Sequence, residues 1–281
     1  MSAPTPLGLI AGNGMLPYRI IENLNKSERA VFALGISGEV ADEVSANMDA
    51  WVGIGQLQLA RDLMQEAGVR DVVIVGSVQR PNLTTLELDE GGLWVVERAL
   101  SQTQRGDNAL LTHVLDYFEA QGFAIVSAAD LLSQVAPLRG LLTEAKMDPH
   151  RQDMVRAVEI AGHIGALDIG QAAIVARGIV LGVESVEGTD AMLARVGELS
   201  EEVRGTLDAR AGVLAKIPKP QQDRRIDLPA LGPQTIAGAA RAGLAGIVFE
   251  ADGVLFEAPD ACIEQANRAG LFLYGLTPEE L

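Results

Sequence analysis

Residues 7–24 read LGLIAGNGMLPYRIIENL, and they predict the opening unit of an α/β fold. Leu7 to Ala11 is a short apolar run typical of a buried strand, and the turn Gly12-Asn13-Gly14 follows it directly. From Met15 to Leu24 the apolar residues recur at helical spacing, so a helix follows the turn. This order of strand, glycine turn and helix is typical of nucleotide-binding α/β units, where the helix N-terminus attracts a phosphate.

The glycine turn has two interpretations, which the sequence leaves open. In the first, Gly12, Asn13 and Gly14 bind a phosphate or sugar of a nucleotide through the backbone. In the second, they only connect a strand to a helix. A dinucleotide-binding fingerprint needs a third glycine, and Pro17 stands at that position. The sequence therefore disfavours an NAD-type site.

Strands and helices alternate up to residue 132, which predicts a Rossmann-like domain with a parallel sheet over residues 1–132. The clearest buried strand is Asp71 to Gly76. Residues 133–149 lose this periodicity and contain prolines, so we expect a linker there. Residues 150–281 then predict a smaller C-terminal α/β domain that carries catalysis.

The second half contains a predicted hairpin and a possible anion site. Two apolar runs, residues 171–176 and 179–183, are separated by Arg177-Gly178, which is the signature of a tight β-hairpin. The segment Glu187-Gly188-Thr189-Asp190 precedes a predicted helix. Thr189 or Asp190 caps that helix in one interpretation. In the other, Gly188 and Thr189 bind an anion through N–H groups, with Glu187 or Asp190 near a metal.

Cations and acids gather in the segment from residue 216 to residue 233, which prolines bound on both sides. Its four cations are Lys216, Lys219, Arg224 and Arg225, and its two acids are Asp223 and Asp227. Arg and Lys suit phosphates, and carboxylates suit a divalent metal or an activated water. A solvated loop with ordinary surface ion pairs is the alternative. The prolines favour a stiff loop that carries a site.

Composition excludes several classes of protein. The formal net charge of −16 argues against nonspecific binding to nucleic acid or to an anionic membrane. The single cysteine, Cys262, excludes an internal disulfide and is expected to be a small core residue. No signal peptide is recognisable, and no apolar stretch reaches the ~18 residues that a membrane span needs. We therefore expect a cytoplasmic protein.

Five short motifs together resemble a known family. In chain order they are GLIAGNGMLP (8–17), GDNALL (106–111), DIGQ (168–171), EGTD (187–190) and QDRRIDLP (222–229). Each motif alone has little specificity, but all five in order cover nearly the whole chain. The chain resembles the UDP-2,3-diacylglucosamine pyrophosphatases of the LpxI type.

The resemblance implies a Mg²⁺-dependent hydrolase of lipid A biosynthesis that cleaves UDP-2,3-diacylglucosamine to UMP and 2,3-diacylglucosamine 1-phosphate (lipid X). It implies two domains with the ligand between them, a homodimer, and a cytoplasmic location with peripheral association with the inner membrane left open. An aspartate of the last motif is essential in the family, which points to Asp223 or Asp227 without separating them. For such a reaction the residues themselves lead us to expect Glu187, Asp190 and Asp223 as metal ligands. The residues that we expect to bind the substrate are Gly12, Asn13, Gly14, Gly188, Thr189, Lys216, Lys219, Gln222, Arg224 and Arg225.

Two rival functions stay open at this point. A nucleotide-dependent oxidoreductase would use the Gly12-Asn13-Gly14 turn, although Pro17 speaks against it. A non-catalytic nucleotide or lipid carrier would bind the same substrate and release no UMP.

Overall fold

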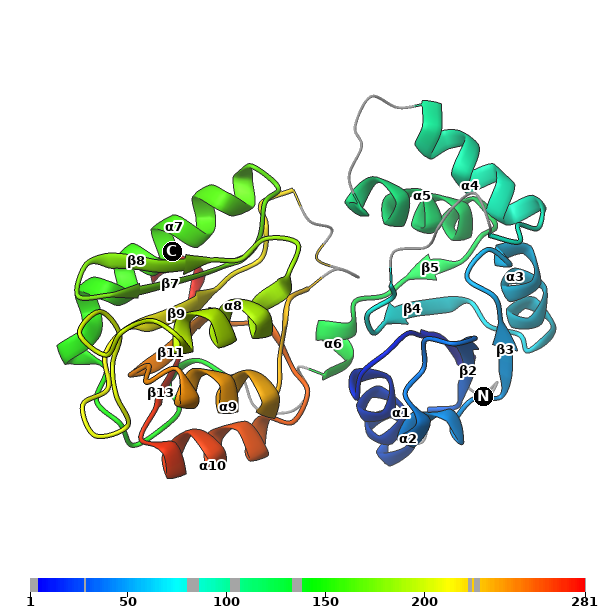
Figure 1. The fold of residues 1–281 in the computed structure, drawn as a ribbon. Helices are drawn as coiled ribbons and strands as arrows, with labels where there is room; N and C mark the ends of the chain where they lie inside the picture. The colour runs from blue at the N-terminus through cyan, green and yellow to red at the C-terminus, as the bar shows by residue number, and fades with distance from the viewer. Residues whose placement is uncertain are drawn as a thin grey trace. The chain divides into compact units, whose positions relative to one another are not determined.

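The computed structural model describes residues 5–27, 29–79, 86–101, 107–132, 138–221, 224 and 228–280. The chain divides into two compact units, residues 1–134 and 135–281 (Figure 1). Both units are α/β, as the sequence predicts. The second is slightly the longer, so it is not the smaller domain that we expected.

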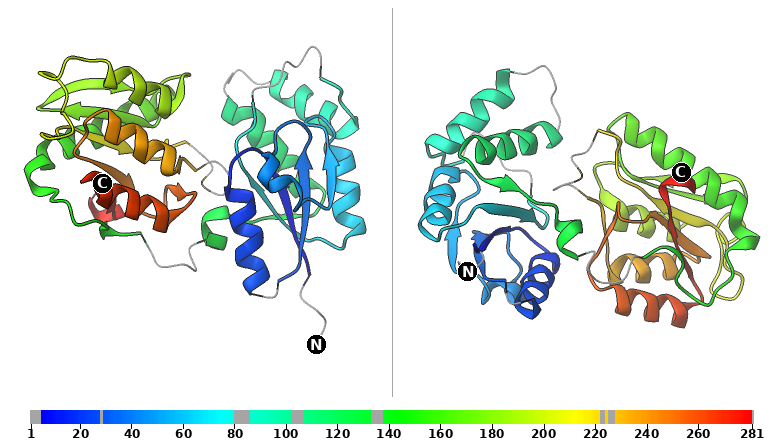
Figure 2. Two further views of the ribbon diagram at one scale, coloured as in Figure 1. Left: turned by 60° about the horizontal axis from the view of Figure 1, so that its bottom comes forward. Right: turned by 180° about the vertical axis from the view of Figure 1, so that it is seen from behind.

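The first unit contains a sheet of parallel strands in the order β3-β2-β1-β4-β5. Helix α1 packs with α6, while α3 packs with α4 and α4 with α5, and helices cover both faces of the sheet (Figure 2). The elements are β1 (Leu7–Ala11), α1 (Leu16–Lys26), β2 (Val31–Ile36), α2 (Asp42–Ser45), β3 (Ala50–Val52), α3 (Leu57–Glu66), β4 (Asp71–Val75), α4 (Glu90–Ser101), α5 (Asp107–Ala120), β5 (Ala124–Ile125) and α6 (Ala128–Leu132).

The strand order places β1 at the centre of the first sheet. The chain moves from β1 to β2 and β3 on one side, and then returns to β4 on the other. The carboxyl ends of β1 and β4 therefore lie at the point where the strand order reverses, which is where open α/β sheets bind ligands. The turn at Gly12-Asn13-Gly14 lies there.

The second unit contains a mixed sheet in the order β6-β13-β11-β9-β7-β8. Strands β9, β11 and β13 run parallel, while β6, β7 and β8 run antiparallel to their neighbours. The elements are β6 (Gly140–Leu141), the 3-10 helix η1 (Asp148–His150), α7 (Arg151–Ala166), β7 (Ala172–Ala176), β8 (Ile179–Val183), α8 (Gly188–Gly197), β9 (Val213–Lys216), β10 (Ala230–Leu231), α9 (Pro233–Arg241), β11 (Gly246–Glu250), β12 (Leu255–Phe256), α10 (Pro259–Ala269), β13 (Phe272–Leu276) and the 3-10 helix η2 (Pro278–Glu280).

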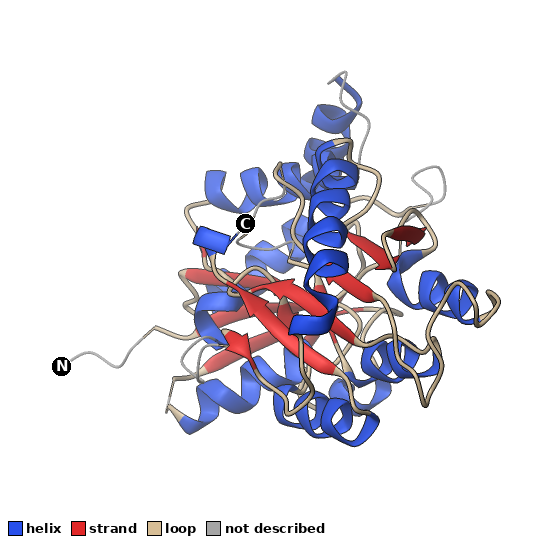
Figure 3. Cartoon of the chain, turned by 90° about the vertical axis from the view of Figure 1, so that its left-hand side faces the viewer, coloured by secondary structure: helices blue, strands red, loops and turns tan. Residues whose placement is uncertain are grey.

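Helices cover both faces of this second sheet (Figure 3). Apolar side chains of α7, among them Met154 and Ala157, pack against one face with Val213 and Ala215. The other face packs against α8, α9 and α10, and this larger core includes the fully buried Cys262, as expected. Successive residues of a strand point to opposite sides of its sheet. Along β9, Val213 and Ala215 therefore pack with α7, while Leu214 packs in the larger core on the other face.

The segment predicted as a linker contributes to the second unit. Gly140 and Leu141 form the edge strand β6, which pairs with β13. Further on, the Thr143 hydroxyl oxygen accepts a hydrogen bond from the backbone N–H of Leu273 at 2.9 Å. Much of residues 138–149 therefore packs as part of the second unit.

Candidate functional site

Two of the C-terminal motifs, DIGQ and EGTD, lie at the edge of the second sheet where strand β9 ends. Strand β9 ends at Lys216, and Lys216 lies opposite Ala172, the first residue of the antiparallel β7. DIGQ (168–171) therefore lies beside the start of the loop 217–229, and the Ile217 N–H donates to the carbonyl of Gln171 at 3.0 Å. EGTD (187–190) follows β8 at the same edge. Local pairing alone brings these separate motifs together.

A buried polar chain occupies this edge. The Lys216 ammonium donates to the Thr189 hydroxyl oxygen at 2.9 Å and to the Ala230 carbonyl at 2.8 Å. The Thr189 hydroxyl in turn donates to Glu184 Oε1 at 2.5 Å, and Glu184 Oε2 accepts the N–H of Gln171 at 3.0 Å. The side chains of Lys216, Thr189 and Glu184 are all buried.

Two opposing effects act on the pKa of Lys216. Burial lowers it, because desolvation disfavours the charged form, and the nearby carboxylates of Glu184, Asp190 and Glu257 act in the opposite direction. The sequence predicts Lys216 as a substrate-binding cation. The structure places its ammonium inside the protein, bonded to protein groups.

Lys219 joins two of the motifs. Its ammonium donates to Asp168 Oδ1 at 2.7 Å, so the start of the loop 217–229 is tied to DIGQ. Asp168 has a positive φ of 57°, an uncommon conformation that aspartate tolerates better than most residues. Nearby, the Gln221 amide donates to the Gly165 carbonyl at the end of α7 at 2.9 Å.

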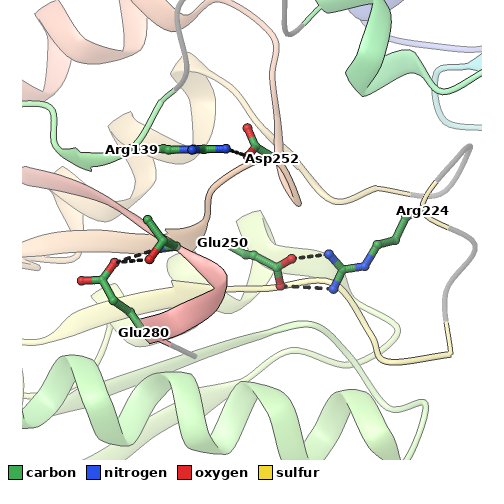
Figure 4. Close-up of polar contacts among 6 residues, drawn as sticks. Arg139, Arg224, Glu250, Asp252 and Glu280 are labelled. Atoms are coloured by element: carbon green, nitrogen blue, oxygen red, sulfur yellow. Dashed lines mark hydrogen bonds and ion pairs between the residues drawn. The ribbon is translucent and has the colours of Figure 1, made fainter.

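Arg224 pairs with a buried carboxylate that sequence reasoning missed. Its guanidinium contacts both oxygens of Glu250, and the second contact, Nη2 to Oε2, is 3.4 Å (Figure 4). The Glu250 side chain is only 6% exposed, whereas that of Arg224 is 58% exposed. The turn after Glu250 is held by an ion pair between Arg139 and Asp252 at 2.5 Å.

The acids of EGTD are engaged with neighbours and do not cap α8. Both Glu187 oxygens accept hydrogen bonds, one from the Ser185 hydroxyl and one from Arg195 at 2.9 Å. The Ser185 hydrogen bond is the largest cause of a lowered pKa at Glu187. Asp190 Oδ1 accepts from the Thr235 hydroxyl at 3.1 Å. Helix α8 has Glu187 at its N-cap without a side-chain cap bond, so the capping interpretation of Thr189 and Asp190 is wrong.

Four predicted site residues lie outside the residues that the structure describes, namely Gln222, Asp223, Arg225 and Asp227. Within the described part of the chain, no group of three His, Cys, Asp or Glu side chains could hold a metal ion. The predicted metal ligands Glu187 and Asp190 therefore stay predictions, as does Asp223.

The glycine turn of the first unit uses its N–H groups internally. Gly12 N–H donates to the Val75 carbonyl at 2.9 Å, and Asn13 N–H donates to the Ser77 carbonyl at 2.7 Å. The Gly14 N–H donates to the Asn13 side chain at 2.8 Å. These three groups, which would bind a phosphate in one of the two interpretations of the sequence, thus already bond within the protein. The glycine at position 12 serves close packing, since a Cβ there would lie 2.5 Å from the Ser77 carbonyl oxygen.

Sequence reasoning missed Glu184, Glu250 and Glu257 as members of this edge. Glu184 directly follows β8, and Glu250 is the last residue of β11. A carboxylate at the end of a buried apolar run was the available signal, because such positions collect at one edge of a sheet. Gln171 was also missed as a site residue, and its side-chain Oε1 is buried without a hydrogen-bond partner among the residues that the structure describes.

None of the helices in the described part of the chain is long and apolar enough to span a bilayer.

Comparisons with known proteins cover both units. Residues 6–135 match the model of the LpxI N-terminal domain, and residues 138–274 match that of the LpxI C-terminal domain. The chain is 42% identical, over 275 residues, to the UDP-2,3-diacylglucosamine pyrophosphatase LpxI of Caulobacter vibrioides. That alignment covers 98% of each of the two chains. The chain therefore belongs to the LpxI family.

Proposed function

We propose that this protein hydrolyses the pyrophosphate bond of UDP-2,3-diacylglucosamine, releasing UMP and 2,3-diacylglucosamine 1-phosphate, in lipid A biosynthesis. The observation that carries the proposal is the 42% identity, over 98% of the chain, to a relative named UDP-2,3-diacylglucosamine pyrophosphatase LpxI. Both domain models of the family also match, in order, along the chain.

The residues of the second unit suit this reaction. Water adds its oxygen to a phosphorus of the diphosphate, the bridging P–O bond breaks, and the phosphate that leaves carries the bridging oxygen away. The reaction needs neutralised phosphate charge and an oriented water. Arg224 is more than half exposed while its partner Glu250 is buried, so its guanidinium is held in place with surface left for an anion. Lys219, Arg225 and Gln222 complete the proposed phosphate-binding set.

The proposed acids are Asp223 and Asp227. One of them orients the attacking water or binds Mg²⁺, which when bound would neutralise charge on the diphosphate. Glu187 and Asp190 are the further proposed ligands, with water in the remaining positions. Of these two, Glu187 is already bonded by Ser185 and Arg195, so Asp190 is the more readily available carboxylate.

The remaining contacts are proposed from the pattern of residues. Gly188 and Thr189 begin α8, whose N-terminal N–H groups favour an anion. In the first unit we propose that the turn Gly12-Asn13-Gly14 contacts the nucleotide through the exposed Asn13 side chain, since the three backbone N–H groups of the turn are already bonded within the protein. We also propose that the protein is a cytoplasmic homodimer. It would associate peripherally with the inner membrane, because the proposed substrate carries two acyl chains.

The test is incubation of the purified protein with UDP-2,3-diacylglucosamine, with Mg²⁺ and with EDTA, while UMP is measured. We expect UMP and 2,3-diacylglucosamine 1-phosphate in equal amounts, and we expect EDTA to stop their release. A carrier would bind the substrate and release no UMP. An oxidoreductase would instead bind NADH, which fluorescence would detect.

The acids are tested by Asp223→Ala and Asp227→Ala, made singly. At least one variant should lose turnover while keeping the wild-type circular dichroism spectrum and melting temperature. Glu201→Ala is the matched control, because Glu201 is an exposed acid outside this edge, and it should keep full activity. If both aspartate variants stay fully active, the assignment of the acids is wrong.

A further inference from the structure

One side chain joins the two ends of the loop that carries the proposed acids. Lys216 is the last residue of β9, and Ala230 is the first residue of β10, so the loop 217–229 lies between them. The Lys216 ammonium donates to the Ala230 carbonyl at 2.8 Å. This hydrogen bond therefore joins the residue before the segment 217–229 to the residue after it.

The same ammonium ties this loop to the first turn of α8. It donates to the hydroxyl of Thr189 at 2.9 Å, and that hydroxyl donates to Glu184 at 2.5 Å. Glu184 is held in turn by the N–H of Gln171. The chain of bonds thus connects the loop base, the EGTD segment and the beginning of β7. A satisfied buried network of this kind holds one arrangement of its members.

Burial separates Lys216 from the other cations of the segment. Lys216 is 6% exposed, and its charge is balanced inside the protein by Glu184 through Thr189. A lysine that binds a diphosphate must present its ammonium to the ligand, as the half-exposed Arg224 can. Replacing Lys216 by a residue without an ammonium would leave the Ala230 carbonyl without this donor.

We propose that Lys216 is a positioning residue, which holds Ala230 and the first turn of α8 in a fixed relation and does not bind the diphosphate. The proposal deepens the function given above and rests on it. In the sequence Asp223 and Asp227 lie between Lys216 and Ala230, so we expect a change at Lys216 to affect turnover. Thr189 is the second positioning residue, because its hydroxyl oxygen accepts the other hydrogen bond of the Lys216 ammonium.

Kinetics of three variants test this role. Lys216→Met removes the ammonium at similar volume, Thr189→Val removes the hydroxyl at similar shape, and Thr189→Ser keeps the hydroxyl. We expect Lys216→Met and Thr189→Val to lower kcat by about 100-fold, the effect of a misplacement of about 1 Å. Their KM should change by less than about threefold. Thr189→Ser should recover most of the kcat that Thr189→Val loses, and Lys146→Met, which changes an exposed lysine of the same unit, should stay near wild type.

Hydrogen–deuterium exchange gives a readout that does not depend on the reaction. Peptides that cover residues 217–231 should exchange faster in Lys216→Met and Thr189→Val than in the wild type, Thr189→Ser and Lys146→Met. Peptides of β4, in the first unit, should not change. If the wild type fails to release UMP, the proposed function fails, and exchange still tests the positioning role.

Three outcomes would overturn the positioning role. One is a folded Lys216→Met with wild-type kcat. Another is a Lys216→Met that raises KM strongly at unchanged kcat, which would show that the ammonium contacts substrate. The third is unchanged exchange over residues 217–231 in both variants. Should Lys216→Met not fold, Thr189→Val alone decides by the same two measurements.

Discussion

Single residues of this protein show how close packing and burial limit what a side chain can do. Gly12 lies against the backbone of Gly76 and Ser77, where the two neighbouring turns bond to each other through Asn13 and Ser77. In the sequence this glycine is typical of a phosphate-binding turn. In the structure its small size first of all lets β1 and β4 end side by side.

Replacing Gly12 by alanine should therefore destabilise the first unit. The added Cβ would lie 2.5 Å from the Ser77 carbonyl oxygen, so the backbone must shift, at a cost of about 1–3 kcal/mol. The control is Gly162→Ala in α7, where the nearest atom to the new Cβ is 3.8 Å away. That change should stabilise by about 1 kcal/mol, through helix propensity. Urea unfolding measures both, and a Gly12→Ala midpoint at or above wild type would contradict the packing argument.

His150 should make stability depend on pH. Burial lowers the pKa of this imidazole below 6.5, with Asp153 opposing the shift, and the ring stacks on Phe272 at 6.1 Å between centroids. As pH falls below 6.5, the unfolded chain takes up a proton before the folded protein does, so stability decreases until the folded-state pKa is passed.

The variant His150→Phe keeps a ring on Phe272 and removes the titration. Its melting temperature should fall less steeply than that of the wild type as pH is lowered from about 7 to 5. If the melting temperatures of the two proteins fall in parallel over this range, His150 does not contribute to the pH dependence of stability. Melting followed by circular dichroism at several pH values gives the comparison.

At the scale of elements, the hairpin of β7 and β8 shows how a local pattern and a distant side chain cooperate. Arg177 and Gly178 both have positive φ, of 51° and 76°, as a tight two-residue turn requires. Asp153 of α7 accepts the N–H groups of both residues, at 2.8 and 2.7 Å. The periodicity of the sequence predicts the hairpin, but nothing local in it predicts this acceptor.

Asp153→Ala should consequently destabilise the second unit by roughly 2–4 kcal/mol, because it removes a charged acceptor from two N–H groups. Asp153→Asn should have a smaller effect, since it keeps one carbonyl acceptor. Gln152→Ala, an exposed neighbour in the same helix, should stay within about 0.5 kcal/mol of wild type. Chemical denaturation orders the three variants, and an Asp153→Ala as stable as Gln152→Ala would refute the role of the acid.

For the whole molecule, each unit has a separate hydrophobic core, so each should fold as a separate chain. We expect the fragment 138–281 to unfold cooperatively. The fragment 151–281 lacks β6 and Thr143, which leaves the N–H of Leu273 without its acceptor, and it should be less stable by at least about 1–3 kcal/mol. Thermal melts of the two fragments test this, and equal stability would place residues 138–150 outside the folded unit.

The sequence by itself predicted the α/β class, most of the strands and helices, and the family, because each of these depends on local patterns. Apolar periodicity and glycine turns report which face of a segment is buried, and five short motifs in order identify relatives. The hairpin at Arg177-Gly178 is confirmed for this reason.

Only the tertiary structure decided which polar groups of the motifs are already engaged. A sequence shows that Lys216 is a cation near acids, but not that its ammonium is buried on Thr189 and Ala230, residues 27 and 14 positions away. Glu250 and Asp153 acquire their partners in the same way, across strands and helices. Such contacts depend on sheet order and on the face to which each residue points, and these follow from the packing of the whole unit.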